Sequence, residues 1–171
     1  ILDAGATRIE TDLSDQPLTQ ARLMQAIGKV YRNLGLYDVA SPKLETALSL
    51  LRSTPGSSAL VMSTSLADLA DVYIDQAKYP QAEEMLSQAI FLMEDTDQEN
   101  SLQVARSLER LAGVYRREGR FEESEPLYHR SHEIFISTLP AGDPEIASSF
   151  NSLAILNYQK GNYDESEVLY K

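Results

Sequence analysis

The chain has 171 residues and carries 15 basic against 26 acidic side chains, a net charge of −11. This excess of negative charge repels phosphate backbones and anionic membrane surfaces, so it argues against a nucleic-acid partner. Cysteine is absent, which excludes disulfide frameworks, thiolate metal sites and cysteine nucleophiles. No apolar run approaches the roughly 18 residues of a membrane span, so we expect no direct membrane insertion.

The cellular compartment of the protein is inferred from targeting signals in the sequence. The sequence shows no signal peptide, and we expect a cytoplasmic protein more than the extracytoplasmic part of a membrane-anchored one. The chain starts and stops inside helical patterns, so we interpret it as a fragment of a longer protein.

A period of 42 residues relates equivalent positions along the chain: Tyr31, Tyr73 and Tyr115 are separated by this step. Small residues at Gly28, Ala70, Ala112 and Ala154 follow the same period. A fixed period of this size is typical of proteins built from stacked repeats, in which each unit buries its apolar face on the next.

In chain order, residues 1–13 are predicted to be the trailing helix of a preceding unit, and residues 14–17 form a break. Four repeats follow, at 21–62, 63–104, 105–146 and 147–171, the last of them truncated. Pro55 and Gly56 separate the first two helix pairs, and residues 95–100 separate the next two.

Each repeat reads as two helices. In the third repeat, Leu108, Leu111 and Tyr115 have helical spacing, and Gly119 suits the left-handed position that ends a helix. A second helical pattern begins at Phe121. Ala77 stands where the other repeats have this glycine, so we expect a left-handed alanine that costs roughly 1 kcal/mol.

Polar and proline residues mark the starts of helices. Asp143 is predicted as an N-cap with Pro144 in the first turn, and Pro80 as the first residue of its helix. Pro42 and Pro126 are predicted to lie early in their helices, where a missing N–H costs least.

These patterns predict an all-α fold: a right-handed α-solenoid of stacked antiparallel helix pairs in a single domain. The motifs resemble the tetratricopeptide repeat, with Leu-Ala-x-x-Tyr at 69–73 and 111–115 and Ile-Gly-x-x-Tyr at 27–31. The 42-residue spacing and the link at 142–144 resemble the kinesin-light-chain subtype. Residues 2–52 are similar to the repeat regions of large bacterial signalling proteins, which implies an accessory region of a multidomain protein.

Three features suggest chemistry, and each has a structural explanation. Eight of the nine tyrosines occupy repeat registers, which indicates packing, and only Tyr158 lies outside them. His129 and His132 are three residues apart, but their registers place the first toward solvent and the second partly buried, with no third metal ligand. Acidic clusters at the starts of second helices stabilise the helix dipole. We therefore expect no enzyme activity, catalytic residue, metal or cofactor.

A polar stripe remains on the first helices after the core positions are removed, at the face that would line a concave groove. Its members, the candidate peptide-binding residues, are Arg22, Gln25, Lys29, Arg32, Asp68, Asp71, Arg106, Glu109, Arg110, Arg116, Asn151, Ile155 and Tyr158. Two explanations stay open: ion-pair ladders between neighbouring first helices, and a groove for an extended or helical peptide with acidic residues.

The family that this chain resembles has a known way to bind a ligand carboxylate, a clamp formed by Lys and Asn at two groove positions of successive first helices. Those positions hold Gln25/Lys29, Ala67/Asp71, Glu109/Gly113 and Asn151/Ile155. Only Lys29 and Asn151 have the required type, so this mode is not expected. The predicted function is non-catalytic binding of a protein or peptide partner. The alternative is a structural spacer, or a module that associates with itself through an exposed C-terminal repeat.

Overall fold

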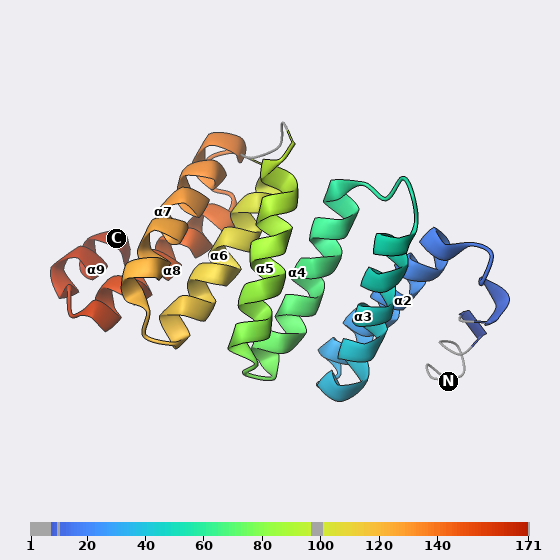
Figure 1. Cartoon of the computed structure of the whole chain (residues 1–171). Helices are drawn as coiled ribbons and strands as arrows, with labels where there is room; N and C mark the ends of the chain where they lie inside the picture. The colour runs from blue at the N-terminus through green and yellow to red at the C-terminus, as the bar shows by residue number, and fades with distance from the viewer. Residues whose placement is uncertain (1–7, 10, 97–100, 171) are drawn as a thin grey trace. The chain divides into compact units, whose positions relative to one another are not determined.

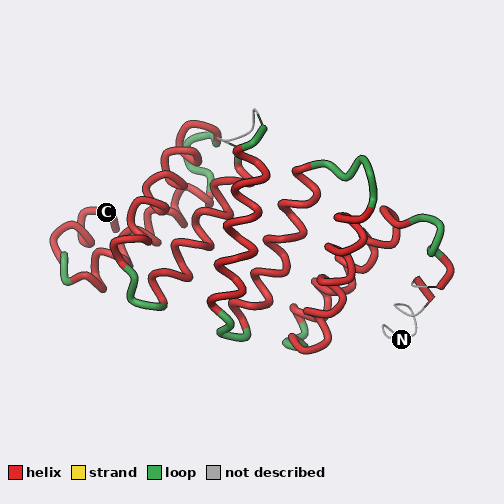
Figure 2. The backbone as a smooth tube through the Cα atoms, in the orientation of Figure 1, coloured by secondary structure: helices red, strands yellow, loops and turns green. Residues whose placement is uncertain are grey.

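The computed structural model describes residues 8–9, 11–96 and 101–170, and places them in two compact units, Ile1–Leu92 and Met93–Lys171. Each unit is treated by itself below. Helices and short loops account for all of the described backbone, without a strand (Figures 1 and 2). The predicted all-α class is thereby confirmed.

Two helix pairs make up most of each unit (Figure 1). The first unit contains α2 (Pro17–Asn33), α3 (Tyr37–Ser53), α4 (Ala59–Asp75) and α5 (Tyr79–Glu94), the last of which continues past residue 92. The second contains α6 (Leu102–Arg117), α7 (Phe121–Thr138), α8 (Pro144–Lys160) and α9 (Tyr163–Tyr170). Of the predicted trailing helix at 1–13, residues 8, 9, 11 and 12 are helical, and 1–7 and 10 lie outside the described residues.

The turn inside each helix pair has the predicted left-handed residue. Gly35, Gly119 and Gly161 have φ of 73°, 78° and 85°, and Ala77 takes the same conformation with φ of 56°. Lys78 N then donates to Tyr73 O at 2.8 Å, the bond that closes this turn. The prediction of a left-handed alanine is confirmed.

Small residues let the two helices of a pair approach closely, as the sequence indicated. A Cβ added to Gly28 would lie 2.6 Å from Leu44 Cγ, so only glycine fits there. In the second unit, buried serines at the small positions also form hydrogen bonds to the facing helix, which their size alone did not predict. These bonds run from Ser124 Oγ to Ala112 O (2.8 Å), Ser131 Oγ to Ala105 O (2.9 Å) and Ser166 Oγ to Ala154 O (2.9 Å).

The predicted N-cap at Asp143 is confirmed, because its side chain accepts from Glu145 N at 2.9 Å and Pro144 begins α8. Pro80 is the second residue of α5, one position later than predicted. The prediction for Pro42 and Pro126 was wrong. Both lie inside their helices, since α3 and α7 begin five residues before them, and each leaves one backbone carbonyl of the preceding turn without its helical donor.

Candidate functional site

The candidate site is the polar side of the first helices, which we call the first-helix face. In the first unit it lies on α2 and α4, and in the second on α6 and α8. The helices put these side chains together because residues three or four apart share one face of a helix.

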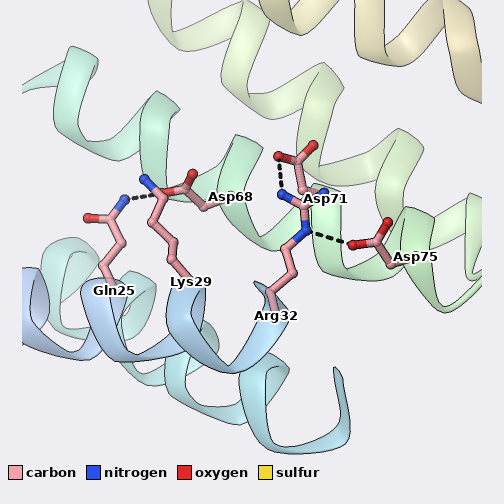
Figure 3. A network of polar contacts seen from close by, with 6 residues as sticks. All are labelled: Gln25, Lys29, Arg32, Asp68, Asp71 and Asp75. Atoms are coloured by element: carbon pink, nitrogen blue, oxygen red, sulfur yellow. Dashed lines mark hydrogen bonds and ion pairs between the residues drawn. The ribbon is translucent and has the colours of Figure 1, made fainter. Parts of the chain in front are cut away.

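On the first unit, α2 supplies the donors and α4 the acceptors of one network (Figure 3). Gln25 Nε2 donates to Asp68 Oδ2 at 2.5 Å, and Lys29 Nζ lies 2.9 Å from the same oxygen. One carboxylate of α4 is therefore held by two side chains of α2.

Arg32 completes this network. Its Nη1 lies 2.9 Å from Asp71 Oδ2 and its Nε 2.6 Å from Asp75 Oδ2. Partial burial opposes the charged form of Arg32, but the hydrogen bond to Asp75 and the nearby carboxylates outweigh it and raise the pKa. The two cations, Lys29 and Arg32, thus face three carboxylates, so the network carries an excess of negative charge.

On the second unit, Arg106 makes a two-pronged bond to Glu145, with Nε–Oε1 at 2.6 Å and Nη2–Oε2 at 2.8 Å. This hydrogen bond is the main reason that the pKa of Glu145 is lowered. Glu109 accepts from Ser152 Oγ at 3.0 Å, yet burial raises its pKa.

Arg116 bonds to α8 within this face and also links α7 to it. Its Nη1 donates to Gln159 Oε1 at 3.1 Å, and its Nε to Tyr128 Oη of α7 at 3.4 Å. The α6 helix also carries Arg110, which is half-buried and already has an interaction partner, and Arg117, which is exposed. Four arginines here stand against two glutamates, so the second unit has an excess of positive charge on the corresponding face.

The remaining candidate residues join none of the polar networks found in the described part of the chain. Arg22 and Asn151 are exposed, and Ile155 is half-buried. Tyr158 is 62% exposed, and its ring packs edge-on against Tyr163 with centroids 5.3 Å apart. Tyr163 begins α9 and is itself 63% exposed, so it makes this packing contact with α8 while most of its side chain stays on the surface.

The two histidines lie as predicted. His129 is exposed, whereas His132 is half-buried, with Nδ1 2.8 Å from Ser149 Oγ and its ring 4.3 Å from that of Phe150. Burial lowers the pKa of His132. Over the described residues, no group of three or more potential ligands is placed to hold a metal.

The sequence reasoning missed the partners Glu145, Gln159 and Tyr128, and the list of candidate residues left out Asp75 and Ser152, which belong to the same polar stripe. A signal for most of them exists. Bonded pairs on this face are 39 or 43 residues apart, as in Arg32–Asp71 and Arg106–Glu145 (39) or Gln25–Asp68 and Arg116–Gln159 (43). These separations flank the 42-residue period and differ by one helical turn, which is the relation expected between neighbouring helices of successive repeats.

The fold and this face define a class: a helical-hairpin repeat protein whose first helices present a charged surface. The sequence profile described as tetratricopeptide repeat matches residues 19–95 and 103–171. The chain therefore belongs to the tetratricopeptide repeat family, whose folds generally serve as non-catalytic scaffolds for protein–protein interaction.

Solved structures support the same fold, and a putative kinesin light chain is among them. BtubC (BKLC) from P. vanneervenii has a TM-score of 0.85 at 18% identity, over 98% of this chain and 67% of its own. A putative kinesin light chain with nearly identical TPR-like repeats from Podosopora anserina has a TM-score of 0.80 at 23% identity, over 90% and 72%. The apo form of RapI has a TM-score of 0.82 at 16% identity, over 94% and 57%.

No curated protein matches this sequence. Within the described residues, every helix is too short or too polar to cross a membrane.

Proposed function

We propose that this protein binds a protein partner by accommodating an acidic peptide segment along the first-helix face of α6 and α8. The observation that carries the proposal is the excess of arginine there, within a chain whose net charge is −11. Arginine suits this role because its planar guanidinium offers several donors, so Arg106 can keep Glu145 and still present an N–H to a ligand.

The corresponding face of the first unit has no such excess, because the three cations Arg22, Lys29 and Arg32 stand against the three carboxylates Asp68, Asp71 and Asp75. Lys29 and Arg32 are both held by carboxylates of α4, at 2.9 Å and closer. A second acidic segment would have to displace those carboxylates, so we assign the acidic ligand to the second unit alone. The resemblance of residues 2–52 to repeat regions of bacterial signalling proteins supports the further proposal that this region belongs to a larger multidomain protein.

The second candidate function is a spacer or self-association module without a peptide ligand. The ion pairs on both faces favour this second function, because the charged groups of each pair already interact with each other. Exposed pairs of this kind contribute only about 0.2–1 kcal/mol each, however, so their presence does not prevent exchange for a ligand carboxylate.

The test is a peptide-display selection on the parent protein and on the Arg106→Glu, Arg110→Glu double variant. We expect acidic peptides to be enriched on the parent only, and the selected peptides to bind the variant at least ~30-fold more weakly, because attraction becomes repulsion at two positions. Circular dichroism should show unchanged helicity.

A matched control has the same change in charge on other surfaces: Arg52→Glu with Arg130→Glu, on α3 and α7. It should retain binding, because only the overall charge changes. Equal binding by parent and double variant would contradict the proposed surface, and no enrichment on the parent would favour the spacer.

A further inference from the structure

Neither the backbone conformation nor the packing at position 113 of α6 requires a glycine. Gly28 needs the close approach to Leu44, and the glycines at positive φ are Gly35, Gly56, Gly119, Gly142 and Gly161. Gly113 has neither reason: a Cβ added there would meet only Tyr128 Oη, at the ordinary contact distance of 3.5 Å. Glycine in a helix interior lowers stability relative to alanine, so this residue destabilises α6 without a gain in packing.

Gly113 occupies a position of α6 that lies on the first-helix face. The other repeats have longer side chains at this position, namely Lys29, Asp71 and Ile155. Repeat 3 therefore has a notch where its neighbours have side chains.

The floor of this notch is polar. Tyr128 is 4% exposed, and its Oη accepts from Arg116 Nε at 3.4 Å. No acceptor for the tyrosine proton exists among the described residues, so a buried hydroxyl donor is left unused next to Gly113. Repeats 1 and 2 have leucine in this register, at Leu44 and Leu86, and repeat 4 combines its tyrosine with Ile155. Glycine and tyrosine occur together only in repeat 3.

We infer that the notch at Gly113 is a specificity pocket that receives one side-chain carboxylate of an acidic peptide, with Tyr128 Oη–H and Arg116 as its donors. The inference rests on the proposed function and names the part of α6 where the ligand approaches closest. The missing side chain admits the carboxylate, the hydroxyl supplies the unused proton, and the arginines of α6 supply the positive charge. Glu109 is the nearest opposing charge on α6, and its bond to Ser152 and raised pKa moderate the repulsion.

The experiment uses the whole chain and a fluorescein-labelled peptide in which glutamates alternate with alanines, with the glutamine version as the neutral probe. Gly113→Ala should weaken binding of the glutamate peptide by about 10-fold and raise the melting temperature by about 3 °C, since the methyl fills the notch and favours the helix. Gly113→Ile, which installs the residue of repeat 4, should weaken binding further.

Tyr128→Phe removes the hydroxyl, which is the donor to the ligand and the acceptor of Arg116 Nε, and should also weaken binding by about 10-fold. Tyr73→Phe is the matched control, because that hydroxyl belongs to the first unit and donates to Glu45 on α3, and binding should not change. In peptides with one glutamate changed to glutamine, one position should lose its sensitivity to Tyr128→Phe. That coupling identifies the carboxylate.

Each outcome is decisive. If Arg106→Glu, Arg110→Glu abolishes binding while Gly113→Ala and Tyr128→Phe bind like the parent, the notch is overturned and the proposed function stands. Weakening by Tyr128→Phe that is equal for all glutamine-substituted peptides would overturn the carboxylate as its occupant. Absence of any binding to the parent would overturn both proposals.

Discussion

At the scale of single residues, backbone conformation and hydrogen-bond partners explain most departures from the repeat pattern. Ala77 takes a left-handed φ of 56° that glycine occupies in the other turns. The helix pair tolerates this because the turn bond from Lys78 N to Tyr73 O is kept at 2.8 Å. The strain of one alanine is small compared with the burial of the two helices that the turn connects.

We expect Ala77→Gly to raise the free energy of unfolding by up to about 1 kcal/mol, because glycine adopts this conformation without a Cβ clash. Chemical denaturation would measure it. Gly35→Ala in the equivalent turn is the matched change and should lower stability by a similar amount. A clear loss of stability in Ala77→Gly would show that the turn does not need a left-handed residue.

At the scale of elements, the contact between the two helices of a pair depends on which residue sits at the crossing point. Gly28 lets α2 approach α3 so closely that Leu44 Cγ would lie 2.6 Å from an added Cβ. The second unit has alanine at the equivalent crossings, and serines such as Ser124 hydrogen bond to the facing carbonyl instead. Helix pairs of one family thus use two different ways to pack.

Gly28→Ala should lower the free energy of unfolding by about 1–3 kcal/mol, because the methyl overpacks a fully buried contact with Leu44. Thermal or chemical unfolding would detect it. Gly113→Ala is the matched control, since the same substitution in another helix interior should be stabilising. Equal effects of the two changes would contradict the packing explanation for Gly28.

At the scale of the whole molecule, two glutamates on the first-helix face of the second unit, Glu145 and Glu109, contribute to the acid dependence of stability in opposite directions. The hydrogen bond from Arg106 lowers the pKa of Glu145, so its stabilisation is present above the ordinary value of 4.5 and is lost as the pH falls through the folded pKa. Burial raises the pKa of Glu109, so its ionised form destabilises the fold at neutral pH, and this penalty disappears below 4.5.

We therefore expect Glu109→Gln to stabilise the protein at pH 7 by on the order of 0.5 kcal/mol, allowing for solvent screening, with no gain at pH 4. Glutamine keeps an acceptor for Ser152. Glu145→Gln should show the opposite sign at pH 7. Melting temperatures measured across this range would decide, and a gain from Glu109→Gln that persists at pH 4 would exclude burial of the charge as its cause.

The sequence by itself determined the helix pairs, the left-handed turns, the cap at Asp143 and the exposure of the two histidines. These features depend on the 42-residue period and on local backbone preferences, which are written in neighbouring residues. It also identified the polar stripe of the first helices, because that stripe is what remains when the buried positions are removed.

Only the tertiary structure decided which charges of that stripe meet. Arg32 with Asp71 and Arg106 with Glu145 are pairs whose distance depends on how far one helix is shifted along its neighbour, and the shift comes from packing. For the same reason, the sequence alone did not reveal the notch at Gly113. Its floor is Tyr128, a residue of a different helix, and only packing of α7 against α6 places that hydroxyl beneath the missing side chain.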